Sequence, residues 1–317
     1  MAKILITGGA GFIASHIQDA YLEKDHRVVV VDNLVTGNKK NLNSKSKFYR
    51  VDITSSEIRE IIKKEKPDII NHHAAQIDVR KSVSDPVWDA KVNILGIINL
   101  LEGAKEAKVK KFIFASSGGA IYGDPEPDPS GRYGARALKI PTPETSPERP
   151  ISPYGVGKLT SEKYLYYYNV QYGLEYVALR YANVYGPRQN SRGEAGVVAI
   201  FLDKLLAGET PIINGDGKQT RDYVYVGDVV KANVLALRAK TGVYNIGTGK
   251  ETDVNQVAGK IVKAIGAKVK PKHGPGKPGE QKRSCIDWGL AKRILKWKPE
   301  IDVDQGIRET VAWFKHR

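Results

Sequence analysis

The sequence predicts an α/β fold in which a doubly wound parallel sheet is joined to a smaller, mixed α/β substrate-binding domain. Three observations predict this fold. Short apolar runs of strand length alternate with segments of helical periodicity up to residue 181, as in a parallel sheet covered by helices. A glycine-rich turn joins the first run to the first helical segment, and Asp32 ends the second run. Beyond residue 181 the alternation gives way to irregular segments, which indicates a second unit.

The first two strands predict a dinucleotide site. A strand is expected at residues 3–7, followed by Gly8-Gly9-Ala10-Gly11-Phe12-Ile13-Ala14 and a helix to about Lys24. Read from Gly9, this turn fits the Gly-x-Gly-x-x-Ala fingerprint, whose glycines let a pyrophosphate approach the helix N-terminus. Asp32, after the strand expected at 28–31, is placed to accept hydrogen bonds from the adenosine ribose and to repel a 2′-phosphate. We therefore predict a Rossmann-type domain that binds NAD rather than NADP.

The alternation continues through the first domain. Further strands are expected at 48–51, 68–71, 111–115 and 176–181, and helices at 55–66, 86–107 and 154–171. Ligands of such sheets gather at the carboxyl ends of the strands. We therefore expect the small and polar residues that follow the strands to line the cofactor site; they are Asp52, Ile53, Ala74, Ala75, Gln76, Ser116 and Ser117.

Tyr154 and Lys158 are predicted to share one face at the start of the helix 154–171, because residues four apart lie one turn above each other. A cation beside a phenol favours the phenolate, so the pair can act as a base. In a chain with 16 tyrosines, about one or two Tyr-x-x-x-Lys pairs arise by chance. The pair therefore gains weight only from the dinucleotide fingerprint upstream.

The rest of the chain predicts a second unit and a return to the first. Residues 124–151 are proline-rich, residues 221–226 open the return, and helices are expected at 197–207 and near 254–265, 288–295 and 305–314. A helix at 228–238 and a strand at 243–246 are expected to rejoin the first domain. We predict an NAD-binding domain of residues 1–181 and 222–247, and a second, smaller domain of residues 182–221 and 248–317.

Composition narrows the function classes. The chain has 50 basic and 35 acidic residues, a net charge of +15, but no basic-aromatic interleaving or nucleic-acid motif accompanies the excess. No apolar run reaches the length of a membrane span. Cys285 is the single cysteine, which leaves no disulfide framework or cysteine metal cluster. We expect a soluble, cytoplasmic protein without a metal, with no nucleic-acid partner and no membrane partner.

Motifs along nearly the whole chain resemble those of the extended short-chain dehydrogenases/reductases, and most closely those of the UDP-glucose 4-epimerases in the NAD-dependent epimerase/dehydratase family. The matching residues and motifs are Gly8-x-x-Gly11-x-x-Ala14, Asp32-Asn33-Leu34, Asp52-Ile53, Ala74-Ala75-Gln76, Asn93, Phe114-Ala115-Ser116-Ser117, Tyr122-Gly123, Ser152-Pro153-Tyr154-x-x-x-Lys158, Arg180-Tyr181-x-Asn183-Val184-Tyr185-Gly186-Pro187 and Arg221-Asp222-Tyr223.

The resemblance implies NAD-dependent 4-epimerisation of UDP-hexoses through a 4-keto intermediate, with Ser117, Tyr154 and Lys158 as the catalytic residues. It implies cofactor binding by Gly8, Gly11, Phe12, Ile13, Asp32, Asn33, Asp52, Ile53, Ala74, Ala75, Gln76, Asn93, Ser116, Tyr154, Lys158 and Tyr181. It implies UDP-sugar binding by Ser117, Asn183, Val197, Phe201, Asn214, Arg221, Lys277 and Ser284. Relatives of this kind also pair as homodimers through the helices predicted here at 86–107 and 154–171, with Val92, Leu95, Ile98, Leu101, Tyr164, Leu165, Tyr168 and Tyr172 on the expected face.

Three departures from the family pattern leave alternatives open. Ala14 stands in place of the usual third glycine, which the fingerprint tolerates. Lys277 stands where these enzymes usually have a diphosphate-binding arginine, and lysine is only a point charge there. Gly118-Gly119 lengthens the turn after Ser117 by one residue, so Ser116 is a rival for the active-site hydroxyl.

The alternative functions are another nucleotide-sugar epimerase, a 4,6-dehydratase or a decarboxylase of the same family and, less favoured, a non-catalytic Rossmann scaffold that binds RNA. Glycines stand where similar dehydratases carry an acidic pair, which disfavours elimination. By analogy with the family, Ser284 is small enough to leave room for an N-acetyl group, so UDP-GlcNAc and UDP-GalNAc are possible substrates.

Overall fold

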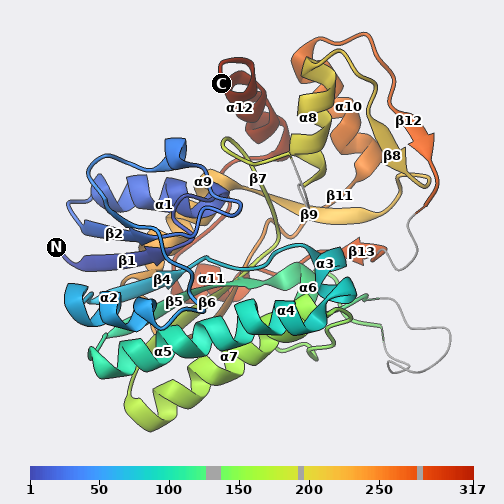
Figure 1. The fold of residues 1–317 in the computed structure, drawn as a ribbon. Coiled ribbons are helices and arrows are strands. Elements are labelled where there is room, and N and C mark those ends of the chain that lie inside the picture. The colour runs from blue at the N-terminus through green and yellow to red at the C-terminus, as the bar shows by residue number, and fades with distance from the viewer. Residues whose placement is uncertain (126–136, 192–195, 277–280) are drawn as a thin grey trace.

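The fold is built on a seven-stranded parallel sheet with helices on both faces (Figure 1). It was obtained as a computed structural model, which describes residues 1–125, 137–191, 196–276 and 281–317, so Lys277 lies outside the described residues. The strands, in their order across the sheet, are β3 (Lys47–Tyr49), β2 (Arg27–Val31), β1 (Lys3–Thr7), β4 (Ile69–His72), β5 (Lys111–Ser117), β6 (Glu175–Tyr181) and β10 (Gly242–Ile246). Every neighbouring pair is parallel, so the predicted fold class is confirmed.

Helices cover both faces, which explains why the strands are almost continuously apolar. Along β1, Ile4 and Ile6 pack into the cluster under α1 (Phe12–Leu22) and α9 (Val226–Ala236). Leu5 points the other way, into the cluster formed with the remaining three large helices of this domain. Those helices are α2 (Glu57–Glu65), α5 (Gly96–Glu106) and α7 (Pro153–Tyr172).

The strand order reverses between β1 and β4. The chain goes from β1 outward to β2 and β3, then returns to the other side of β1 for β4, β5 and β6. Such a reversal opens a crevice beyond the carboxyl ends of the two central strands, where ligands of doubly wound sheets bind. The glycine-rich turn after β1 and the residues after β4 and β5 all lie at this edge.

The helix predicted at 86–107 is not continuous, and this expectation was wrong. The structure has α4 (Pro86–Ala90), a π-helical segment η2 (Lys91–Leu95) and then α5. An unpredicted helix, α3 (Val79–Ser84), precedes them. A π-helical turn inserts one residue into a helix and is frequent at functional sites. Here the inserted turn contains Asn93, which is buried.

The second unit contains its own sheet and core. Its four-stranded sheet is formed by β7 (Asn183–Tyr185), β9 (Thr220–Tyr225), β11 (Glu251–Asp253) and β13 (Arg283–Ser284), and β8 (Ile212–Asn214) pairs with β12 (Lys272–Gly274). The helices that enclose its apolar core are α8 (Val197–Leu206), α10 (Val254–Ile265) and α12 (Val303–Lys315). The sequence analysis expected none of these strands, because all except β9 span only two or three residues.

The expected division into two domains stays a prediction. Strand β9 crosses the expected boundary at residue 222 and pairs entirely within the small sheet. The short helix α11 (Gly289–Ile294) packs Ala291 against the large-sheet core although it was assigned to the second domain. Two short elements complete the fold: η1 (Lys39–Asn41) and α6 (Gly118–Ile121). Within the described ranges, no helix is both long enough and apolar enough to cross a membrane.

Candidate active site

Helix α7 starts at the edge of the sheet where the strands have their carboxyl ends, and its first turn determines where Tyr154 lies. The Ser152 side chain accepts a hydrogen bond from the Gly155 backbone N–H at 3.2 Å, and Pro153 occupies the first turn. Serine caps and first-turn prolines both favour a helix start. A Cβ at Gly155 would lie 2.6 Å from the Ala120 carbonyl oxygen. Glycine therefore lets α7 approach α6, directly beyond β5.

The three predicted catalytic side chains come together at this point. Tyr154 and Ser117 interact through their side chains, and this interaction lowers the pKa of the phenol. The Lys158 Nζ lies 5.7 Å from the centre of the Tyr154 ring and donates a hydrogen bond to the Ala115 carbonyl at 2.8 Å. Helix α7 and strand β5 are thus tied together on both sides of the phenol.

The geometry separates the two serines after β5. The Ser117 Oγ accepts a hydrogen bond from the Ala120 N–H at 3.3 Å, which leaves its own proton available for an oxygen beside Tyr154. Ser116 is buried and points to the opposite face, where its hydroxyl donates to Glu162 Oε1 at 2.5 Å. The turn between Ser117 and Ile121 is the short helix α6. The side chain of Ser116 is therefore committed elsewhere, and the geometry supports Ser117.

The electrostatics of the pair differ from the expectation. The pKa of the Tyr154 hydroxyl is raised to about 12, mainly by burial and in addition by the Asp89 carboxylate, while the interaction with Ser117 lowers it. Burial also lowers the pKa of the Lys158 ammonium to about 8, against the effects of Asp89 and Glu162. The expectation that Lys158 makes the phenol acidic is not met in the protein alone, because desolvation disfavours both charges.

A buried ion-pair network joins β6 to α7, the helix that carries Tyr154 and Lys158. The sequence analysis missed this network. Arg180 is 2% exposed and binds Glu162 through two hydrogen bonds of 2.9 and 2.6 Å. It also donates to the Tyr122 hydroxyl at 2.8 Å and to Glu148 at 2.5 Å. Glu162 follows Lys158 by one helical turn. A lone arginine inside the apolar strand β6 is the sequence signal that could have indicated a buried partner.

The glycine-rich turn has the shape that a dinucleotide requires. Gly8 has a φ of +70°, and a Cβ there would lie 2.7 Å from the Ala74 nitrogen. Gly11 starts α1 without a side-chain cap, so the first N–H groups of the helix, at Phe12 and Ile13, point toward the crevice. The Asp32 carboxylate accepts hydrogen bonds from the Ala10 and Leu34 N–H groups at 3.0 and 2.8 Å. These residues fit the expected cofactor.

Residues around this turn form the rest of the predicted cofactor pocket. Asn33 donates to Asp52 at 2.8 Å, which links the ends of β2 and β3. The remaining predicted members at this edge are Ile53, Ala74, Ala75, Gln76 and Asn93. Tyr181 was also predicted to bind the cofactor, but its hydroxyl is engaged inside the core. It accepts a hydrogen bond from Asn233 at 2.8 Å and contacts the His73 ring nitrogen at 3.1 Å.

The predicted substrate residues are only partly brought together. A Cβ on Gly119 would lie 3.7 Å from Ser284 Oγ, 3.9 Å from Asn183 Oδ1 and 4.0 Å from Ser117 Oγ. These three polar groups therefore border one space. Phe201 is instead 4% exposed in the core of the small domain.

The other substrate positions lie on the small domain. Val197 begins α8, Asn214 ends β8 and Arg221 lies on β9, where it donates to the Thr220 carbonyl at 2.8 Å. In the part of the chain that the structure describes, no group of three or more histidine, cysteine or acidic side chains is placed to hold a metal ion.

Comparisons with known proteins agree with this geometry. The profile of the NAD dependent epimerase/dehydratase family matches residues 4–247. A crystal structure of UDP-glucose 4-epimerase from Thermotoga maritima, determined with UDP-glucose, is 45% identical with a TM-score of 0.93, covering 99% of this chain and 98% of the other. The Thermus thermophilus UDP-glucose 4-epimerase, in complex with NAD, is 42% identical with a TM-score of 0.90 and covers 99% of both chains.

A third similar structure is that of a 4-epimerase named for an N-acetylated sugar nucleotide. The UDP-N-acetylglucosamine 4-epimerase from Methanobrevibacter ruminantium, in complex with UDP-N-acetylmuramic acid, is 35% identical with a TM-score of 0.88. The similarity covers 99% of this chain and 98% of that one.

Proposed function

The chain belongs to the NAD dependent epimerase/dehydratase family, and on that premise we propose that it interconverts UDP-glucose and UDP-galactose by NAD-dependent 4-epimerisation. The observation that carries the proposal is the meeting of Ser117, Tyr154 and Lys158 at the switch point of the sheet. An acceptor for a hydroxyl proton, a hydroxyl donor and a cation are the groups that oxidation of a sugar alcohol needs beside a dinucleotide.

The cofactor site fits NAD. We assign the pyrophosphate to the N-terminus of α1 beside Gly8 and Gly11, and the adenosine ribose to Asp32. NAD, when bound, accepts the hydrogen of the sugar's C4 as hydride and returns it, and its nicotinamide ring brings a positive charge to the site. Lys158 is placed to hold the ribose of that ring, since its Nζ is fixed between the Ala115 carbonyl and the Tyr154 ring.

The protein's own part is the movement of one proton. Tyr154 takes the proton of the sugar 4-hydroxyl as C4 is oxidised and gives it back when C4 is reduced from the other side. Ser117 donates a hydrogen bond to the same oxygen, which stabilises the charge that develops there. Because burial holds the Tyr154 pKa near 12, added positive charge beside the phenol is what brings its ionised form within reach at neutral pH.

The sugar nucleotide is assigned to the space between the two domains. We propose that Asn183, Arg221 and Lys277 hold its diphosphate and that Val197, Phe201 and Asn214 lie near the uracil. Phe201 supports the uracil from within the core of the small domain and exposes little of its ring. The buried, single Cys285 fits a reducing compartment, so we propose a cytoplasmic location.

The dehydratase alternative lacks a residue on which it depends. Elimination of the 6-hydroxyl requires an acid near Ser117, and positions 118 and 119 are glycines whose backbone forms α6. An RNA-binding scaffold would not require the buried contacts that join Tyr154, Ser117 and Lys158. Incubation of the protein with UDP-galactose and NAD should yield UDP-glucose, whereas salt-dependent RNA binding without turnover would favour the scaffold.

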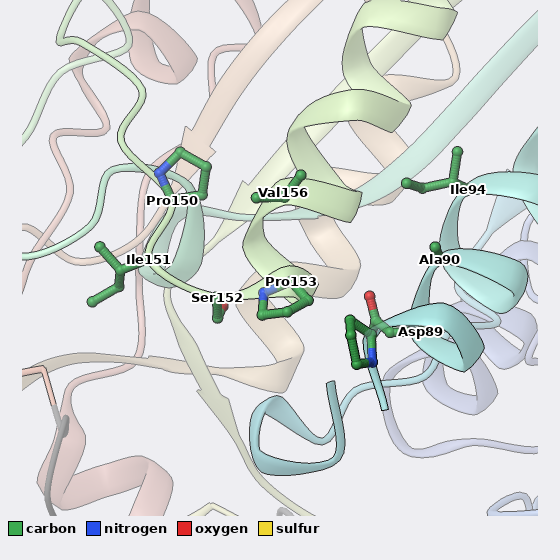
Figure 2. Close-up of a pocket in the computed structure, with 9 residues that line it drawn as sticks. Asp89, Ala90, Ile94, Pro150, Ile151, Ser152, Pro153 and Val156 are labelled. Atoms are coloured by element: carbon green, nitrogen blue, oxygen red, sulfur yellow. The ribbon is translucent and has the colours of Figure 1, made fainter. Parts of the chain in front are cut away.

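We also propose that the protein is a homodimer that pairs through α4, η2 and α7. Of the residues expected on this face, Leu101, Leu165 and Tyr168 are buried in the monomer core, which corrects the expected face. Leu95 and Tyr172 of the expected set are exposed, and the other exposed apolar side chains of these elements and of the residue pair before α7 include Val87, Ile151, Val156, Tyr166, Tyr167 and Val170. Two of these side chains, Ile151 and Val156, border a cavity of about 520 Å³ that lies between α4, η2 and the start of α7 (Figure 2). An apolar face of this extent favours association.

Light scattering should therefore give twice the 34.9 kDa mass of one chain. Tyr166 is 61% exposed on α7, and Tyr166→Glu should shift the protein toward monomer because a charge would be buried at the interface. Ile212, on β8, is 51% exposed outside this face, so Ile212→Glu is the matched control and should leave the dimer intact. A monomeric mass for the unchanged protein would refute the dimer.

The range of sugars is proposed to include UDP-GlcNAc and UDP-GalNAc. Ser284 is buried on β13, and its hydroxyl borders the same space as Ser117. Ser284→Tyr should suppress conversion of the N-acetylated pair at least about tenfold more than conversion of UDP-galactose, because a bulky ring excludes the larger substituent. Ser284→Ala is the control, since it keeps the space and removes only the hydroxyl. Failure of the unchanged protein to convert UDP-GlcNAc would contradict the proposal.

A further inference from the structure

Asp89 is a buried carboxylate that none of the catalytic or cofactor assignments uses. It lies on α4, is 1% exposed, and borders the base of the cavity shown in Figure 2. Removing a carboxylate this completely from water is costly unless its oxygens are well paired. The partners of Asp89 therefore indicate what the residue is for.

One of its oxygens is held by two amide side chains. Asp89 Oδ1 accepts hydrogen bonds from Gln76 Nε2 at 2.8 Å and from Asn93 Nδ2 at 3.0 Å. Asn93 also bonds the main chain of Gln76, accepting from its N–H at 3.0 Å and donating to its carbonyl at 2.9 Å. Gln76 lies on the same loop as Ala74, which packs against Gly8. Asp89 thus fastens the π-helical turn to the wall of the dinucleotide pocket.

The other oxygen faces the catalytic helix. A Cβ on Gly157 would lie 3.5 Å from Asp89 Oδ2 and 3.4 Å from Asn93 Cβ, so the backbone of α7 packs directly on this pair. Gly157 immediately precedes Lys158. Ser161, one turn further along α7, donates to the Asn93 carbonyl at 3.1 Å. The same unit therefore touches the cofactor wall on one side and the catalytic helix on the other.

We propose that Asp89 is a positioning residue of this active site, which locks Gln76 and Asn93 in place and sets the charge beside Tyr154 and Lys158. The proposal rests on the proposed function for its role in turnover. The contacts of Asp89 with Gln76 and Asn93 are present without substrate, so their effect on NAD binding can be measured independently of turnover. The π-helical turn has a physical purpose in this account, because it brings Asn93 inward to meet Asp89 and Gln76.

The negative charge of Asp89 determines the direction in which the pH–rate profile should move when that charge is removed. The nearby ionisable groups of α7 are Tyr154, Lys158 and Glu162, while Arg80, Lys81 and Lys91 on the neighbouring elements are exposed to solvent. The Asp89 carboxylate raises the pKa of both Tyr154 and Lys158. Removing its charge therefore lowers both pKa values, and the two limbs of the pH–rate profile, which belong to the pair, should both move toward acid.

Two variants test the lock and the charge separately. Asp89→Ala removes the acceptor that joins the two buried amides, so Gln76 and Asn93 each lose one hydrogen bond and NAD should bind about tenfold more weakly or worse by calorimetry. Asp89→Asn keeps an acceptor oxygen without the charge, so it should bind NAD better than Asp89→Ala while its pH–rate profile for UDP-galactose moves toward acid. Asp228→Asn is the matched control, because it changes another buried carboxylate whose hydrogen bonds go to Glu300 and Ile301.

Each outcome decides one question. NAD binding by Asp89→Ala that equals that of the unchanged protein would overturn the lock, whatever the turnover. A lower kcat for Asp89→Asn with an unmoved pH profile would overturn the role of the charge and leave only a structural one. Absence of turnover in the unchanged protein, with NAD bound, would instead contradict the proposed function.

Discussion

Tyr154→Phe is expected to lower kcat about a thousandfold while NAD and UDP-galactose still bind. The change removes one oxygen, which interacts with Ser117 and is the proposed acceptor of the sugar hydroxyl proton. The aromatic ring beside Lys158 remains, so the shape of the pocket is kept. Loss of kcat without loss of affinity is the pattern of a group that acts mainly in the transition state.

Steady-state kinetics with UDP-galactose and calorimetric binding of NAD measure the two effects. Tyr167→Phe is the matched control, because it removes a phenol oxygen from an exposed position of the same helix. The control should keep normal turnover. Near-normal kcat in Tyr154→Phe would end the assignment of Tyr154 as the proton acceptor.

Ser117→Ala is expected to lower kcat about a hundredfold, the cost of one hydrogen-bond donor to a developing negative charge. The loss should appear without a large change in thermal stability, because Ser117 Oγ accepts within the protein only a 3.3 Å bond from Ala120 and pairs otherwise with Tyr154. It should be smaller than the loss in Tyr154→Phe, since the base remains.

Ser116→Ala separates a structural hydroxyl from a catalytic one. The Ser116 hydroxyl donates to the buried Glu162, so its removal should lower the free energy of unfolding by about 1–3 kcal/mol. Its kcat should fall less than that of Ser117→Ala. Thermal melts and kinetics on both variants give the comparison. A larger loss of kcat in Ser116→Ala would reverse the assignment of the two serines.

The large sheet could be predicted because each of its features has a local signal. The strands are short apolar runs, the turn after β1 carries its glycines at fixed spacing, and Asp32 follows β2 directly. Tyr154 and Lys158 were predicted to face each other because a helix places residues four apart on one side. Local regularity of this kind survives in the folded chain, so the sequence pattern and the structure agree here.

The supporting residues could not be predicted in the same way. Asp89, Glu162 and Arg180 gain their meaning from contacts between distant segments, such as the bonds from β6 to α7. The break in the expected helix 86–107 also depends on tertiary contacts, because Asn93 must reach both Asp89 and the Gln76 main chain. No local periodicity distinguishes a π-helical turn from a regular helix over five residues.

The predicted direction of the Tyr154 pKa shift was wrong for a related reason. A lysine four residues away is visible in the sequence, but the desolvation of both groups and the position of Asp89 are not. In the folded protein, burial is the largest cause of the shift in both pKa values. The small domain was also predicted poorly, since its strands β7, β11 and β13 span only two or three residues each.

The most direct test of the account is the fate of deuterium placed at C4 of UDP-galactose. We expect the UDP-glucose formed to keep the deuterium at C4, because the hydrogen leaves and returns within one closed site and does not exchange with water. NMR of the product in ordinary water measures this retention. Product that has lost its deuterium to solvent, or no UDP-glucose at all from protein shown to bind NAD and UDP-galactose, would contradict the central claim.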